Sequence, residues 1–254
     1  MRKGPMIEAE SQLTAAQRVG AGLERHPAAH RAATLALQAA ALFRRSRQLD
    51  RYFREVSPEK RCLLIGSGAM TLDGWLCTDL VPVRSSIVCL DATKHWPISS
   101  GSFRYVVCEH MIEHVSYEAG LRVLSEAHRA LLPQGVLRIS TPNLDVIRLL
   151  PDSRDPEVEE YVRWSNQTFG SPMEQADAAS PVHALNRVMR AWGHTYLYDE
   201  STLRQALTRA GFRHIVCCEP GQSQHTQLVG VDRHATLIGE SANRVESLIL
   251  EATA

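Results

Sequence analysis

The sequence predicts an α/β fold in which a mostly parallel sheet is covered on both faces. Short apolar runs alternate with turn residues from residue 61 onward, and helical patterns fall between them. The runs are apolar almost throughout, as is typical of strands that are buried on both faces. The chain has 254 residues, 44% of them hydrophobic, which is enough for one sizeable core and an appendage.

The N-terminal part, residues 1–58, is expected to form a separate helical segment. It is rich in alanine, leucine and arginine, and its pattern predicts helices over about 11–24 and 28–48, with a short helix near 49–56. Its apolar face could cover an active site or pair with a second copy, as in a homodimer. Residues 59–254 are expected to form the main domain.

The order of elements in the main domain follows from its apolar runs and caps. Five strands are predicted, at 62–65, 75–80, 86–91, 103–109 and 136–141. Ser116 can cap a helix that Pro133 and Gly135 end. Another capped helix is predicted over 199–212, and the last strand pair at about 214–218 and 246–252. Between them, residues 143–200 are too long for a plain connection, so we expect an insertion with its own helices that forms a lid.

The glycines after the first strand raise the question of the ligand. Gly66 and Gly68 stand where a dinucleotide fold has its phosphate-binding turn, but Asp79 follows Gly66 by only 13 positions. In a dinucleotide fold the ribose-binding acid comes about 20 residues on, after a helix whose N-terminus binds the phosphates. The short spacing leaves no room for that helix. A ligand with ribose and adenine but no phosphate would not need it, and S-adenosylmethionine is such a ligand.

Candidate ligand-binding residues stand at four consecutive strand ends, where open α/β sheets bind their ligands. The glycine turn would let the backbone pass close to the amino-acid part of the cofactor. Asp79 would accept hydrogen bonds from both ribose hydroxyls, and Asp91 would accept one from the adenine amino group. Glu109 and His110 would line the methionine side. The expected cofactor-binding set is Gly66, Ser67, Gly68, Asp79, Asp91, Ala92, Thr93, Glu109 and His110.

These motifs resemble those of a known family. LLIGSG, then CLDAT, then WPISSGSFRYVVCEHMIEHV is similar to class I S-adenosylmethionine-dependent methyltransferases, in particular the small-molecule group with EHV after strand four. The resemblance implies a Rossmann-like doubly wound sheet with an antiparallel last strand, S-adenosylmethionine as cofactor, and a role in small-molecule biosynthesis. The shortened first helix departs from the common pattern and leaves open which residues hold the cofactor's carboxylate.

The stretch HMIEH also matches a zinc-hydrolase signature, H-x-x-E-H. That signature must lie within a helix, whereas here it follows directly on an apolar strand and precedes the Ser116 cap. We therefore expect it in a loop. Some ubiquinone-type O-methyltransferases are similar in having E-x-x-E-H here and can hold a divalent cation. His110, Glu113 and His114 match that spacing, but histidine is a poor magnesium ligand, so no metal is assigned.

Three histidines are candidates for the proton transfer that often accompanies methyl transfer. His114 lies closest in sequence to the expected cofactor pocket, while His183 and His194 lie in the lid insertion. A structural role stays open for each of them.

Composition limits the partners. Basic and acidic residues number 28 each, and the lid is not basic, which disfavours nucleic acid and a membrane surface. Six cysteines without C-x-x-C spacing, and no signal-peptide-like apolar core, favour the cytoplasm. Two other functions stay open: a binding protein with this fold, and an enzyme that uses the cofactor site for other chemistry. The acceptor has no readable code.

Overall fold

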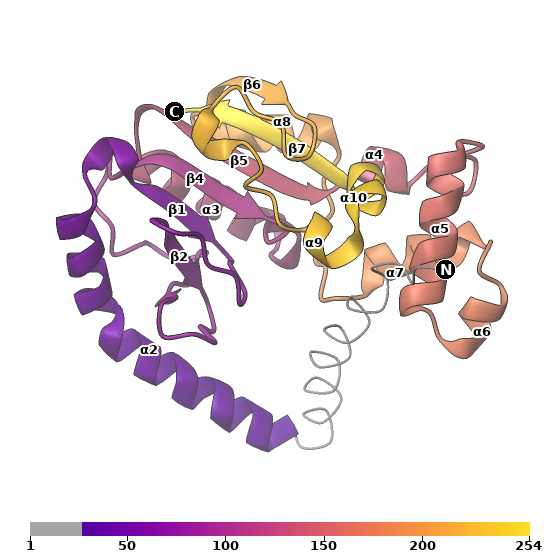
Figure 1. Ribbon diagram of the computed structural model, residues 1–254, viewed down its shortest axis with the longest axis horizontal. Helices are drawn as coiled ribbons and strands as arrows, with labels where there is room; N and C mark the ends of the chain where they lie inside the picture. Colours follow the sequence, from indigo (N-terminus) through magenta and orange to yellow (C-terminus); the bar gives the residue numbers. More distant parts are fainter. Residues whose placement is uncertain (1–26) are drawn as a thin grey trace, which may run out of the picture.

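The computed structural model describes residues 27–254, and a seven-stranded sheet lies at its centre (Figure 1). The strand order is β3-β2-β1-β4-β5-β7-β6, with β1 to β5 parallel to one another and β7 antiparallel to both β5 and β6. The strands are β1 Cys62–Ile65, β2 Leu76–Asp79, β3 Val88–Cys89, β4 Phe103–Glu109, β5 Leu131–Pro142, β6 Arg213–Cys217 and β7 Ser247–Thr253. The mostly parallel sheet with antiparallel C-terminal strands confirms the predicted fold class.

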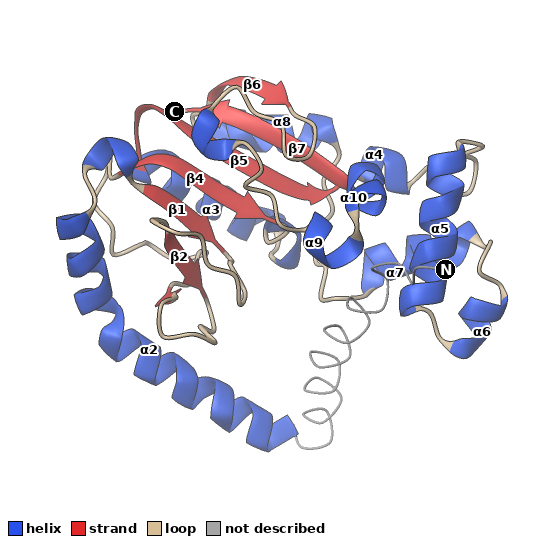
Figure 2. Ribbon diagram, in the orientation of Figure 1, coloured by secondary structure: helices blue, strands red, loops and turns tan. Residues whose placement is uncertain are grey.

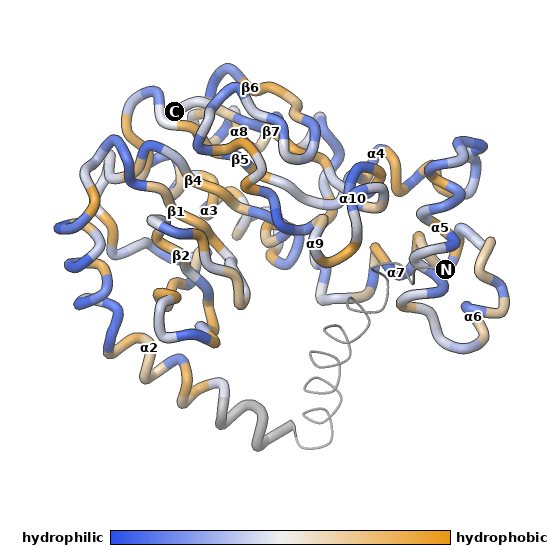
Figure 3. Tube along the Cα trace, in the orientation of Figure 1, coloured by the Kyte–Doolittle hydropathy of each residue, from blue (hydrophilic) through white to orange (hydrophobic). Residues whose placement is uncertain are grey.

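Both faces of the sheet are buried, as the uninterrupted apolar runs predicted. Leu63 and Ile65 of β1 belong to the larger core, beneath α3 (Tyr117–Ala130) and α8 (Glu200–Arg209). Leu64 between them faces the opposite way and packs with side chains from η3 (Thr226–Leu228) and the loop after it. Figure 3 shows the hydrophobic segments concentrated in the central strands.

The helices follow the sequence signals closely in the second half of the chain. The Ser116 side chain caps α3, and the Asp199 side chain caps α8. Residues 143–198 form helices of their own, which lie beside the sheet (Figure 2). They are α4 Leu144–Ile147, α5 Pro156–Phe169, α6 Pro172–Ala176 and α7 Pro181–Arg190. After β6 come α9 Ala235–Ile238 and α10 Glu240–Glu246.

The N-terminal helices differ from the expectation. One continuous helix, α2 (Pro27–Glu55), replaces the predicted pair with a break near residue 48, because no proline or glycine interrupts it. Its last turns pack Leu49, Tyr52 and Phe53 into the larger core. The predicted helix at 11–24 lies outside the described residues, and pairing with a second copy stays a prediction. No described helix is long and apolar enough to cross a membrane.

A buried ion cluster fastens the segment between β6 and β7 onto the sheet. Arg138 of β5 is 1% exposed and contacts Asp232 at 2.5 Å and Glu251 of β7 at 2.7 Å. It also donates to the carbonyl oxygens of Gln222 and Glu219. The residues that follow Asp232 in this segment therefore reach the candidate site from an anchored point.

Candidate functional site

The site begins at the turn after β1, which contains no helix before β2, as the short spacing predicted. Gly66 and Gly68 have φ values of 65° and 57°, the left-handed region that side chains rarely adopt. A Cβ on Gly66 would lie 2.5 Å from the Met111 Cγ, so only glycine fits. The buried Ser67 hydroxyl has no hydrogen-bond partner among the described residues, and it lines a cavity where a ligand's polar group can meet it.

Two carboxylates stand at the carboxyl ends of neighbouring strands. Asp79 ends β2; its Oδ2 accepts from the Gly68 N–H and its Oδ1 from the Val81 N–H, both at 2.8 Å. Asp91 follows β3, and its Oδ1 accepts from the backbone N–H and hydroxyl of Thr93 at 3.0 and 2.6 Å. The Asp91 Oδ2 has no partner among the described residues. Both acids are thus held in place and keep acceptor capacity for a ligand.

These residues enclose a cavity of ≈ 380 Å³, named here the nucleoside cavity. Its wall includes most of the predicted cofactor-binding set: Gly66, Gly68, Asp79, Asp91, Ala92, Thr93 and His110. The buried Trp96 supports the wall by donating from its indole nitrogen to the Ala92 carbonyl at 3.0 Å. The glycines, the paired acids and the free Ser67 hydroxyl next to the cavity fit an adenosine with an amino-acid tail.

A second cavity of ≈ 490 Å³, named here the acceptor cavity, shares Gly66, Gly68, His110 and His114 with the first. Ser67 and Glu109, the other two residues of the predicted set, line it. The lid supplies Phe169, Trp192 and His194, and the segment before β7 supplies His234, Leu237, Ile238 and Glu246. The acceptor cavity therefore joins the nucleoside cavity to the lid.

Two of the three candidate catalytic histidines meet in the acceptor cavity. The rings of His114 and His194 lie edge to face, with centroids 5.1 Å apart. The Nδ1 of His194 hydrogen-bonds the Val188 carbonyl, so its Nε2 is the nitrogen left for a ligand. The backbone N–H groups of Thr195 and Tyr196 donate to the Glu113 carbonyl at 2.7 and 3.1 Å, which fixes the lid's end beside the loop.

His183 lies elsewhere. It lines a third cavity of ≈ 740 Å³ within the lid, which shares Phe169 and Trp192 with the acceptor cavity, and its Nε2 lies 3.4 Å from Asp177. The structure does not bring it to either of the two joined cavities. It lies on α7, in the lid as predicted, and lines neither the nucleoside cavity nor the acceptor cavity.

Buried carboxylates give the acceptor cavity its electrostatics. Burial raises the pKa of Glu109, whose Oε1 accepts from the Arg233 and His234 N–H groups. Burial alone would also raise the pKa of Glu113, but the hydrogen bond and charge of His110 outweigh it and lower this pKa. In turn, burial would lower the pKa of His110, but Glu113 raises it. The two groups therefore stabilise each other's charged forms across a 3.2 Å contact.

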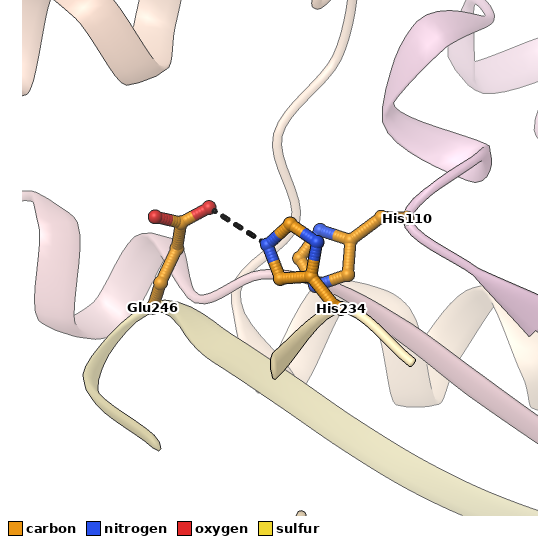
Figure 4. A group of neighbouring side chains, drawn as sticks. All are labelled: His110, His234 and Glu246. Atoms are coloured by element: carbon orange, nitrogen blue, oxygen red, sulfur yellow. Dashed lines mark ion pairs between the residues drawn. The ribbon is translucent and has the colours of Figure 1, made fainter. Parts of the chain in front are cut away.

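His234 and Glu246 complete this wall, and neither was among the residues predicted for the site. The His234 ring stacks on His110 with centroids 3.7 Å apart, and its Nε2 lies 3.5 Å from the Glu246 Oε1 (Figure 4). Burial would raise the pKa of Glu246, but His234 and His110 lower it. They lie more than 100 residues after His110, and no motif connects them to it.

The HMIEH stretch does not form a zinc-hydrolase helix, as expected. His110 follows directly on β4 with a φ of 44°, and Ile112–His114 form a single 3-10 turn, η2. His110 and His114 consequently belong to different side-chain clusters, one with His234 and Glu246 and the other with Glu113 and His194. The stretch is a loop between the two cavities.

The model of a family described as a methyltransferase domain matches residues 15–217. No curated protein matches the sequence. Among solved structures, a SAM-dependent methyltransferase from Archaeoglobus fulgidus is similar over 82% of this chain and 91% of its own, with 15% identity and a TM-score of 0.44. One from Mesorhizobium loti is similar over 82% and 98%, with 19% identity and a TM-score of 0.43.

A further similar structure is Haemonchus contortus phosphoethanolamine N-methyltransferase 2 with phosphomonomethylethanolamine and S-adenosylhomocysteine, at 15% identity and a TM-score of 0.42. The match covers 82% of this chain and 52% of that protein, so the chain spans about half its length. The family match covers most of the chain, including the strands and the glycine turn that line the nucleoside cavity. The chain therefore belongs to the methyltransferase-domain family.

Proposed function

We propose that the protein transfers the methyl group of S-adenosylmethionine to an oxygen or nitrogen of a small molecule held in the acceptor cavity. The observation that carries this proposal is the junction of the two cavities at Gly66, Gly68, His110 and His114. One cavity has the acids that suit a nucleoside. The other has an apolar lid and polar side chains, as is typical of small-molecule sites.

The roles of the residues follow from their positions. The Asp79 and Asp91 carboxylates would accept from the ribose hydroxyls and the adenine amino group, and the left-handed glycines would let the backbone approach the amino-acid tail. The cofactor, when bound, supplies an electrophilic methyl group. Phe169 and Trp192 would exclude water from the path of the acceptor.

His114 is the proposed base, because it is the one candidate histidine that lines both cavities. A neutral imidazole suits removal of the acceptor's proton near pH 7. His194 lies against it, and its tautomer is set by the Val188 carbonyl. We leave His183 out of the proposed site. The six cysteines are free thiols, which supports a reducing, cytoplasmic setting as part of the proposal.

Calorimetric titration with S-adenosylmethionine and S-adenosylhomocysteine tests the cofactor cavity. We expect micromolar binding that Asp79→Ala abolishes, because the substitution removes the ribose acceptor and releases the Gly68 N–H. Asp73→Ala is the matched control: its carboxylate is exposed in the same connection and lines neither cavity. If neither ligand binds the wild-type protein while NAD does, the proposal is wrong.

A further inference from the structure

Three buried carboxylates line the acceptor cavity. Glu109, Glu113 and Glu246 are 8%, 0% and 6% exposed. Among the described residues, the ion pairs of these carboxylates are with imidazoles alone: His110 for Glu113 and His234 for Glu246. Burying a carboxylate is costly unless it is paired or coordinates a metal. The wall of this cavity therefore suits a bound cation.

His234 has a ring nitrogen that lies within ion-pair distance of Glu246 but makes no hydrogen bond among the described residues. Its Nε2 is buried and has no hydrogen-bond partner among the described residues, and it faces the Glu246 Oε1 at 3.5 Å (Figure 4). A hydrogen bond would bring these atoms to about 2.7–3.2 Å. Two ligands on one tetrahedral zinc, each about 2.0–2.1 Å from the metal, lie about 3.3–3.5 Å apart. The observed separation matches shared ligation better than a hydrogen bond.

His110 supplies a third donor. Its ring stacks on His234 at an interplanar angle of 20°, and one ligand atom from each of His110, His234 and Glu246 lies within 4.8 Å of the others. The His110 Nε2 lies 2.9 Å from the Ser247 hydroxyl, which itself donates to Asn243. A cation would displace the proton on that nitrogen. It would also tilt the stacked rings, since the lone pairs of parallel rings do not converge.

Two of the three side chains, those of His110 and Glu246, are held from behind in the way metal ligands are, and the third residue is held through its backbone. The His110 Nδ1 contacts the Glu113 carboxylate at 3.2 Å, and the Glu246 Oε2 accepts from the Tyr161 hydroxyl at 2.7 Å. The backbone N–H of His234 donates to Glu109 at 2.8 Å. Metal-binding histidines usually bond a carboxylate through their other nitrogen, and metal-binding carboxylates are themselves hydrogen-bonded.

We propose that His110, His234 and Glu246 bind one divalent transition-metal cation of the zinc type in the wall of the acceptor cavity. Two imidazoles and a carboxylate suit zinc and its first-row neighbours, whereas magnesium and calcium prefer oxygen ligands. Three protein ligands leave one coordination position for a small molecule. This last step rests on the proposed function: the open coordination position favours an acceptor that presents an oxygen donor beside the atom to be methylated.

Zinc titration of the chelator-treated full chain tests the site, by calorimetry and by competition with a chromophoric chelator. We expect one equivalent to bind with micromolar or tighter affinity, and His234→Ala and Glu246→Gln each to weaken binding at least tenfold. His114→Ala and His194→Ala remove histidines of the neighbouring cluster and should leave zinc affinity within about twofold. Cys217→Ser, which removes an exposed thiol, should also leave it unchanged.

A second measurement does not depend on any variant. Cobalt(II) bound to the wild-type protein should give the visible absorption bands of a tetrahedral nitrogen–oxygen site. The inference is overturned if the wild-type chain binds no zinc, or if binding is lost with His114→Ala and His194→Ala but kept with His234→Ala. S-adenosylmethionine titration of the same samples separates the two proposals: cofactor binding without zinc overturns only this one, and zinc binding without cofactor overturns only the proposed function.

Discussion

Gly66 and Gly68 offer a test of the site's geometry, because they share a conformation but differ in their surroundings. Both have left-handed φ values and both line the two cavities. A Cβ on Gly66 would meet the Met111 Cγ at 2.5 Å and its Cβ at 2.8 Å, whereas a Cβ on Gly68 would meet nothing within 4 Å. Alanine at the two positions therefore separates backbone strain from overpacking.

The expected losses of stability follow from these contacts. The left-handed conformation costs an L-residue about 1–2 kcal/mol, and this cost applies to both variants. Gly66→Ala must also move the Met111 side chain near its root, and overpacking of this kind costs about 1–3 kcal/mol more. The effect of alanine on the unfolded chain is the same at both positions and cancels in the comparison. Gly66→Ala should thus be the less stable variant by about 1–3 kcal/mol.

Urea unfolding followed by circular dichroism measures this difference, and thermal melting should show it as a lower Tm by about 2–4 °C per kcal/mol. Cofactor calorimetry adds a second readout. Gly68→Ala places a methyl group in open cavity space, so it should weaken S-adenosylmethionine binding while the fold stays nearly intact. Equal losses of stability in the two variants would refute the reasoning, since the contact with Met111 would then have no consequence.

Two further predictions concern the Glu126 carboxylate, which pairs with Arg129, and the proposed base, His114. Burial opposes the charged form of Glu126, but Arg129 and the Trp96 N–H lower its pKa from 4.5 to about 2. Its stabilising effect is therefore present above pH 4.5 and lost as the pH falls through about 2. Urea unfolding should show Glu126→Gln less stable than wild type at pH 7, by a difference that shrinks toward pH 2; a constant difference would contradict this. His114→Ala should keep cofactor affinity by calorimetry yet slow S-adenosylhomocysteine formation on an acceptor panel by about 10²–10⁴-fold, and unchanged turnover would return His114 to a loop-anchoring role.

The positions of the strands along the chain were predictable because the signals for a strand are local. Cys62–Ile65 and Phe103–Glu109 match the predicted ranges, since a continuous apolar run between turn residues suits a buried parallel strand. The third strand was predicted over six residues, but it pairs with its single neighbour, β2, over only two, Val88–Cys89. The length of a strand depends on where its neighbour pairs with it, and an apolar run in the sequence does not contain that information.

The cofactor residues could be grouped from the sequence for a topological reason. Parallel strands in one sheet bring their carboxyl ends to one edge, so Asp79 and Asp91 were expected beside Gly66, and the structure places them around one cavity. His234 and Glu246 could not be found in the same way. They arrive by the antiparallel β7 and the segment before it, which Arg138 and Glu109 fasten to the sheet. Those contacts are long-range, and neither residue stands in a periodic pattern.

The two cavities are lined by different parts of the chain. Every residue lining the nucleoside cavity lies between Gly66 and Val115, in the stretch that carries the family's motifs. The acceptor cavity adds side chains from the lid and from the segment before β7, such as Trp192 and His234. Loops on a rigid scaffold can change without disturbing the sheet beneath them. We therefore expect acceptor choice to depend on these two segments and cofactor binding to depend on the strand ends.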